Sequence, residues 1–163
     1  RHLNMLKKIV LGIVRLMLSG LLCTAGTHTH KDAGMSIWFP DDWKVTADGD
    51  MLEATSPGEH AYVQLMALDV ETLDDAVETY TKEIDKIVKN FKTTSEGENK
   101  EANGLSIFYI DGNGFVEGVK MDITIALAVT KKAIVMIVAF STDEHSDEHD
   151  EDIDDIYDSM KAI

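Results

Sequence analysis

The chain has 163 residues, with 30 acidic and 15 basic side chains, so its formal charge at pH 7 is −15. Nucleic acid is excluded as a partner, because it binds Lys and Arg clusters with release of counterions and this acidic chain has no such cluster. The single cysteine, Cys23, cannot form an intramolecular disulfide, so a hydrophobic core must stabilise the fold. The length is sufficient for one domain of ordinary size.

The first 25 residues contain no acid, and they combine Lys7 and Lys8 with an apolar run over Leu16–Cys23 and small residues up to Ala25. This pattern predicts a signal peptide over residues 1–25, cleaved on export to the periplasm or the extracellular space. The exported protein then has 11 basic and 30 acidic residues, a net charge of −19. Residues 1–4 precede the first methionine and are interpreted as upstream sequence.

Two alternatives concern the same segment. A lipid anchor on Cys23 would make the protein a lipoprotein, although Leu22 and Gly20 depart from the usual lipoprotein signal. An uncleaved anchor is disfavoured, because Arg15 leaves an apolar stretch shorter than the ~20 residues of a membrane span. We therefore expect no membrane span in the mature form.

Residues 26–33 are expected to be a flexible tail. His28 and His30 in this tail could chelate copper or nickel with a new α-amino group, but a plain exported tail is the preferred interpretation. Apolar runs and alternation bounded by turn residues then predict four strands. They are Met35–Phe39, Trp43–Thr46, Met51–Thr55 and His60–Leu68.

The next segment has helical periodicity. Apolar residues recur every three or four positions from Leu73 to Phe91, which places them on one helical face. Thr72 is the expected N-cap, and Asp74 and Asp75 follow it where the helix dipole favours negative charge.

Strands are expected again after this helix, with a last helix at the end of the chain. Lys92–Asn99 is predicted as an edge strand, Asn103–Gly104 as a turn, and Asp111–Gly114 as a hairpin connection. The remaining strands are Leu105–Ile110, Phe115–Thr130 and Ile134–Phe140, and the last helix presents apolar residues from Ile153 to Ile163. The predicted class is α+β, a single-domain α/β/α sandwich over residues 34–163 with a mostly antiparallel central sheet.

Several of these motifs resemble the PsbP-like superfamily, in particular its bacterial DcrB-like secreted and periplasmic members. They are Ile37-Trp38-Phe39-Pro40 with Trp43, the central helix, the Asn103–Gly104 turn, and the terminal helix through Asp158-Ser159-Met160. The resemblance implies an α/β/α sandwich and a non-enzymatic binding or accessory role. The photosynthetic members support the photosystem II oxygen-evolving centre, but no partner-contact motif of theirs is matched here.

One segment has the composition of a metal site. If the acidic stretch Asp143–Asp152 is helical, His145 and His149 share a face, with Glu148 or Asp152 near enough to add oxygen ligands. The alternative is a solvated acidic helix start whose charges favour the helix dipole. The sequence thus suggests a divalent-cation site as the one candidate for a bound cofactor.

The chain contains no catalytic motif, such as Gly-x-Ser-x-Gly, His-Glu-x-x-His or a phosphate-binding Gly-Lys-Ser/Thr. We therefore expect an exported, non-enzymatic binding or accessory protein whose partner is a protein of the cell envelope. The alternative function is divalent-cation binding by the acidic segment. A hydrolase would require carboxylates of perturbed pKa in a cleft.

Overall fold

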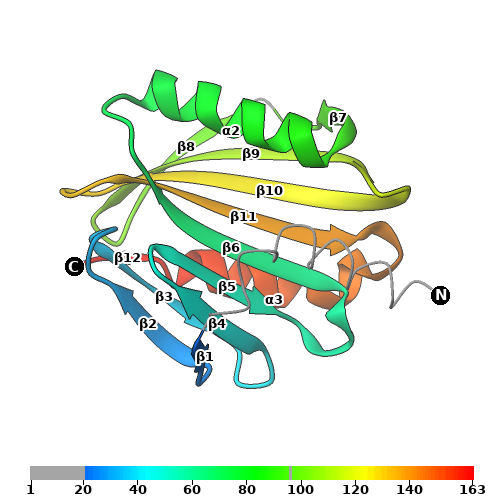
Figure 1. Ribbon diagram of the computed structural model, residues 1–163, viewed down its shortest axis with the longest axis horizontal. Coiled ribbons are helices and arrows are strands. Elements are labelled where there is room, and N and C mark those ends of the chain that lie inside the picture. The colour runs from blue at the N-terminus through cyan, green and yellow to red at the C-terminus, as the bar shows by residue number, and fades with distance from the viewer. Residues whose placement is uncertain (1–20, 96) are drawn as a thin grey trace.

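A long antiparallel sheet forms the centre of the structure, a computed structural model that describes residues 21–95 and 97–163 (Figure 1). In these described residues the strand order of the large sheet is β1-β4-β5-β6-β11-β10-β9-β7, with β8 also paired to β9. A second sheet has the order β12-β3-β2. The strands are β1 (Leu21–Cys23), β2 (Gly26–His30), β3 (Met35–Phe39), β4 (Lys44–Asp48), β5 (Met51–Thr55), β6 (Ala61–Leu68), β7 (Lys89–Thr93), β8 (Glu98–Ala102), β9 (Leu105–Val116), β10 (Val119–Val129), β11 (Ile134–Thr142) and β12 (Lys161–Ala162).

The helices lie on opposite faces of the large sheet (Figure 1). They are α2 (Leu73–Ile87) and α3 (Ser146–Asp158), with the short turns η2 (Pro57–Glu59) and η3 (Asp143–His145). One core cluster joins α2 to the sheet, and the other joins α3 and the small sheet to the opposite face. Strand β11 contributes buried side chains to both clusters, which explains why its sequence is apolar throughout. The predicted α+β sandwich is confirmed.

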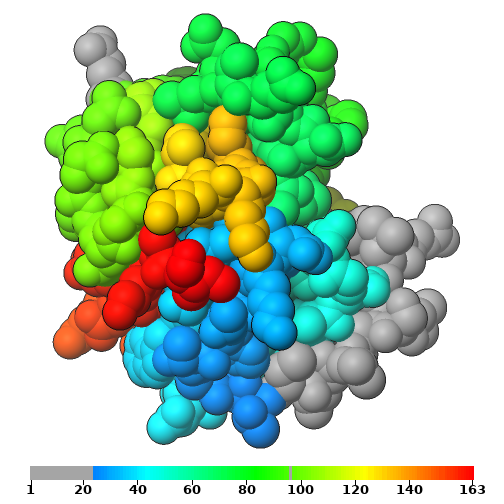
Figure 2. All heavy atoms as spheres, turned by 90° about the vertical axis from the view of Figure 1, so that its left-hand side faces the viewer, coloured from blue at the N-terminus to red at the C-terminus, as the bar shows by residue number. Residues whose placement is uncertain are grey.

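Residues 26–33 were expected to be a flexible tail, but Gly26–His30 form β2, which pairs with β3. The chain end lies beside this segment, since the amide of Ile163 donates to the carbonyl of Gly34 at 3.2 Å. The Thr130 hydroxyl donates to the carbonyl of Ala33 at 2.6 Å. Figure 2 shows the three parts together, with β2 and β3 in blue, the β10–β11 turn in yellow to orange and the C-terminus in red.

Helix α2 begins as predicted and ends earlier than predicted. The Thr72 side chain accepts a hydrogen bond from the amide of Asp75 at 3.1 Å, which confirms the N-cap. The helix ends at Ile87, and Phe91 lies in β7. The apolar periodicity extends to Phe91 in the sequence because the Phe91 side chain, although it lies in β7, packs against the same core cluster as α2.

The hairpin predicted at Asp111–Gly114 is wrong. Strand β9 runs through these residues without interruption, and the turn is Glu117–Gly118, with φ of 47° and 82° as a tight hairpin requires. A Cβ at Gly112 would lie 2.6 Å from the Phe91 ring, and one at Gly114 would overlap Cγ1 of Val88. These glycines therefore permit close packing of β7 and the end of α2, and do not form a turn.

The second half of the chain differs from the predicted elements in two further places. The predicted edge strand Lys92–Asn99 is two strands, β7 and β8, and the last helix stops at Asp158, so Ile163 is exposed beyond it. The Asn103–Gly104 turn is confirmed, and the Asn103 amide donates to the carbonyls of Asp158 and Met160 at 3.1 and 3.0 Å. Two motifs that suggested the superfamily are thus in direct contact.

The predicted signal peptide, residues 1–25, lies mostly outside the described residues. Of it, the structure describes Leu21–Cys23, which pair with β4, and Thr24 and Ala25. None of the helices among the described residues is long and apolar enough to cross a membrane.

Candidate functional site

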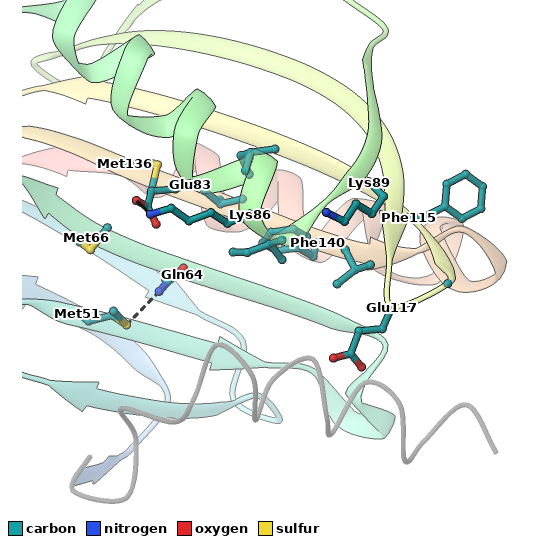
Figure 3. Close-up of a pocket in the computed structure, with 15 residues that line it drawn as sticks. Met51, Gln64, Met66, Glu83, Lys86, Lys89, Phe115, Glu117, Met136 and Phe140 are labelled. Atoms are coloured by element: carbon teal, nitrogen blue, oxygen red, sulfur yellow. Dashed lines mark hydrogen bonds and ion pairs between the residues drawn. The ribbon is translucent and has the colours of Figure 1, made fainter.

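A groove of about 820 Å³ lies between the C-terminal half of α2 and the face of the large sheet (Figure 3). Ile84 and Ile87 of α2 form one wall, the β9–β10 hairpin closes one end, and β5, β6 and β11 form the floor. The floor side chains are Met51, Gln64, Met66, Met136, Val138 and Phe140. The volume is within the range of ligand-binding pockets, ~300–1,000 Å³.

The groove is apolar inside and charged at its rim. Methionines supply three of its floor residues, and flexible thioethers of this kind adapt to ligands of differing shape. Gln64 donates to the Met51 sulfur at 3.0 Å. Phe115, at the outer end, is 40% exposed and is one of three large apolar side chains exposed among the described residues.

The rim carries both signs of charge. Glu83 and Lys86 form an ion pair at 2.7 Å, and Lys89 and Glu117 lie further along. Among the described residues Lys89 has no ion-pair partner. A rim with two lysines and two glutamates has no net charge, so it selects neither an anionic nor a cationic head group.

A buried acid lies on the same sheet face, two residues from Met51. Glu53 is 2% exposed, and burial raises the pKa of its carboxyl above the ordinary value. Burial also raises the pKa of Tyr62 well above its usual range, with the Glu53 charge adding to this effect. Neither Glu53 oxygen has an aligned hydrogen bond to a described residue. A buried acid whose carboxyl holds its proton to a higher pH than usual is thus built into the sheet beside the groove.

The acidic segment has a histidine cluster of its own on the opposite side of the large sheet. His145 ends η3, and its ring stacks on that of His60, with centroids 3.7 Å apart and planes 2° from parallel. Nδ1 of His145 lies 3.2 Å from one oxygen of Glu148, and Nδ1 of His60 lies 4.0 Å from the other. The amide of Thr142 donates to the carbonyl of His60 at 3.0 Å, which holds the two segments together.

His149 lies in the first turn of α3 and is buried. Its ring centroid is 6.2 Å from those of both Trp43 and His60, and it meets the Trp43 ring edge-on. The side chain is 8% exposed, and neither ring nitrogen has a hydrogen-bond partner among the described residues. Both ring nitrogens of His149, one a donor and one an acceptor in the neutral imidazole, are therefore buried without partners, which is costly and uncommon in folded proteins.

The structure divides the predicted metal ligands. It brings His145 and Glu148 together with His60, whose ligand atoms all lie within 4.8 Å of one another. His149 and Asp152 are not in this group. No sequence pattern indicated His60, since it follows η2, far from the acidic segment, and only the pairing of β6 with β11 brings it there. His28 packs against Phe39 instead of lying in a tail.

Solved structures identify the fold. The solution structure of cyanobacterial PsbP (CyanoP) from Synechocystis sp. PCC 6803 is similar at a TM-score of 0.65 and 8% identity, covering 86% of this chain and 93% of that one. The chain has the PsbP-like fold. The resemblance expected from Trp43, Asn103 and the terminal helix is therefore confirmed for the fold.

Two other solved structures are similar to this chain at low identity. A Pseudomonas aeruginosa protein of unknown function, PA94, a putative regulator by its description, matches at a TM-score of 0.55 and 14% identity, over 84% of this chain and 96% of that one. A Bacteroides thetaiotaomicron protein matches at a TM-score of 0.58 and 14% identity, and the match covers 86% of this chain and 49% of that one. No family model and no curated protein matches the sequence.

Proposed function

We propose that this PsbP-like protein is an exported, non-enzymatic accessory protein of the cell envelope that binds an apolar segment of a partner protein in the groove beside α2. The groove is the observation that carries the proposal, because its floor is apolar over a volume large enough to hold several side chains of a partner. Export is supported by the acid-free, Lys-containing start of the chain.

A polypeptide is the occupant favoured by the rim. A fatty acid or other amphipathic anion would need unbalanced positive charge at the mouth, whereas the rim has two glutamates for its two lysines: Lys86 is paired with Glu83, and Lys89 shares the rim with Glu117. Exposed Phe115 extends the apolar surface beyond the groove, so a bound segment can continue past its end. The methionines of the floor suit a partner whose side chains vary in shape.

The proposal is tested with the uncharged dye N-phenyl-1-naphthylamine, whose fluorescence rises in apolar sites. We expect the folded protein to bind it and Met66→Glu, which places a charge on the groove floor, to bind it at least tenfold more weakly. Val129→Glu is the matched control, because Val129 is an exposed apolar residue outside the groove. Equal dye binding by both variants, or none by the wild type, would contradict the proposal.

Displacement of the dye separates the classes of occupant. A short leucine-rich peptide should displace it from the wild type, and sodium dodecanoate at the same concentration should not. Displacement by dodecanoate alone would replace the peptide-binding role with lipid binding.

A further inference from the structure

Buried polar atoms without partners are concentrated around His60 and the start of α3. Besides both nitrogens of His149, they include the Thr142 hydroxyl and one oxygen of Glu59, and Nδ1 of His145 has no aligned hydrogen bond, although a Glu148 oxygen lies 3.2 Å away. Most buried polar groups in native proteins are hydrogen-bonded, so such a concentration requires an explanation. A ligand that accepts electron pairs from nitrogen would satisfy the histidine ring nitrogens among these atoms.

We propose that His60, His145 and Glu148 bind one transition-metal ion of the Zn²⁺ type, with His149 as the neighbouring donor for the fourth position. The three ligand atoms already lie within 4.8 Å of one another. Around a tetrahedral Zn²⁺ with bonds of about 2.0–2.1 Å, ligand atoms are separated by about 3.3 Å. The remaining difference is within the reach of side-chain rotation.

The stacked rings show which movement binding requires. Two parallel imidazoles direct their lone pairs along parallel planes, so they cannot both point at one ion. One ring must rotate about its χ2 angle, and both side chains are about 30% exposed, which leaves them room. Binding should therefore separate the His60–His145 stack.

The donors select the class of metal. Two or three imidazoles and one carboxylate suit Zn²⁺, Co²⁺, Ni²⁺ or Cu²⁺, whereas Ca²⁺ and Mg²⁺ require mostly oxygen ligands. Burial and the neighbouring His145 lower the pKa of His60, which favours the neutral ring, the form that binds metal. The contact with His145 lowers the pKa of Glu148, which keeps that carboxylate ionised.

The site differs from the one suggested by sequence, because its first ligand comes from the loop before β6 and not from the acidic helix. A metal here would join this loop to the start of α3, close to the backbone hydrogen bond that the Thr142 amide donates to the His60 carbonyl. The inference does not depend on the groove, which lies on the other face of the sheet.

Calorimetric titration of Zn²⁺ into the metal-stripped full chain tests the proposal. Cys23 is changed to Ser in every protein, so that the thiol contributes nothing. We expect one Zn²⁺ per chain, at least tenfold weaker binding in His60→Gln and in His145→Gln, and unchanged binding in the matched control His28→Gln. Co²⁺ should give the visible absorption bands of a nitrogen and oxygen site, and Ca²⁺ should give no heat.

Three results would overturn the inference: no Zn²⁺ binding, equal Zn²⁺ affinity in wild type and His60→Gln, or loss of affinity in His28→Gln alone. Circular dichroism of each metal-free variant checks that it is folded. Glu148→Gln supplies a variant that does not disturb packing, since this side chain is 61% exposed. Glu148→Gln should weaken Zn²⁺ binding, and an unchanged affinity would show that the Glu148 carboxylate is not a ligand.

Discussion

The rings of His60 and His145 stack 3.7 Å apart although one precedes β6 and the other ends η3. The antiparallel pairing of β6 with β11 places these two loops at the same end of the sheet, where the amide of Thr142 bonds to the carbonyl of His60. Close contact of two imidazoles disfavours their simultaneous protonation. The stability of the protein should therefore depend on pH near neutrality.

The first prediction is that stability falls as the pH drops below about 6.5. The pKa of His60 is lower in the folded state, chiefly because of burial and then His145; His149 adds to this lowering, and the carboxylates of Glu148 and Glu144 oppose it. The unfolded state then binds more protons as the pH falls through the ordinary histidine pKa, so unfolding is favoured. Above that pH the His60 ring is neutral in both the folded and the unfolded state, so it no longer lowers the stability of the protein.

Thermal unfolding of metal-free protein between pH 5 and 8 measures this effect. His60→Gln should show a smaller decrease in melting temperature over this range than the wild type, and His28→Gln should behave as the wild type. If the wild type and His60→Gln lost the same number of degrees, His60 would not be the group responsible.

The second prediction concerns Gly114 in β9. Gly114→Ala should destabilise the protein by roughly 1–3 kcal/mol, because the added methyl group overlaps Cγ1 of Val88 and lies 3.1 Å from the Lys89 carbonyl. In a Val88→Ala background the same change should cost less, since the larger overlap is removed. Urea unfolding of the four proteins gives the coupling energy, and strictly additive costs would contradict the packing explanation.

The same glycines show where sequence reasoning succeeded and failed. Strands with period two, the Thr72 cap and the buried strand β11 were predicted correctly, because each pattern reflects a local or one-face requirement. Asp111-Gly112-Asn113-Gly114 has the composition of a turn, yet its glycines are needed for contact with Phe91 and Val88. Glycine is required both in turns and where distant segments pack closely, so the sequence alone does not distinguish a turn from a close contact.

The candidate sites were predictable to different degrees. His145 and Glu148 are close in sequence, so helical spacing indicated them, but His60 depends on strand pairing and left no local pattern. The groove was not predicted at all. Its methionines and Phe140 are spread over three strands. In the sequence each one has the pattern of an ordinary core residue, and only the position of α2 shows that they line a groove.

The third prediction concerns Asn103, whose amide donates to the carbonyls of Asp158 and Met160. Asn103→Gly should cost about 1–2 kcal/mol, because it removes two hydrogen bonds from the end of α3 while keeping a residue that tolerates a φ of 52°. Asn90→Gly is the matched control, since Asn90 also has a positive φ, 55°, and its side chain is exposed. Equal effects in the two variants would show that these hydrogen bonds add no stability.

The last prediction is that Glu53→Gln stabilises the protein near neutral pH, by an amount on the order of 1 kcal/mol. The folded-state pKa of Glu53 is raised by burial, so the carboxyl holds its proton longer in the folded state than in the unfolded one. Stability that is fully present below the ordinary pKa of about 4.5 is therefore lost as the pH rises through the folded-state value. An amide at this position carries no charge and does not titrate.

Urea unfolding at pH 4 and at pH 7.5 tests this sign. The difference between Glu53→Gln and the wild type should be small at pH 4 and should favour the variant at pH 7.5. Glu83→Gln is the control, because Glu83 is a partly exposed partner of Lys86 and its replacement should lower stability slightly, if at all. A Glu53→Gln variant less stable than the wild type at pH 7.5 would mean that the carboxylate is satisfied in the folded protein, and that its ionised form contributes to the sheet beside the groove.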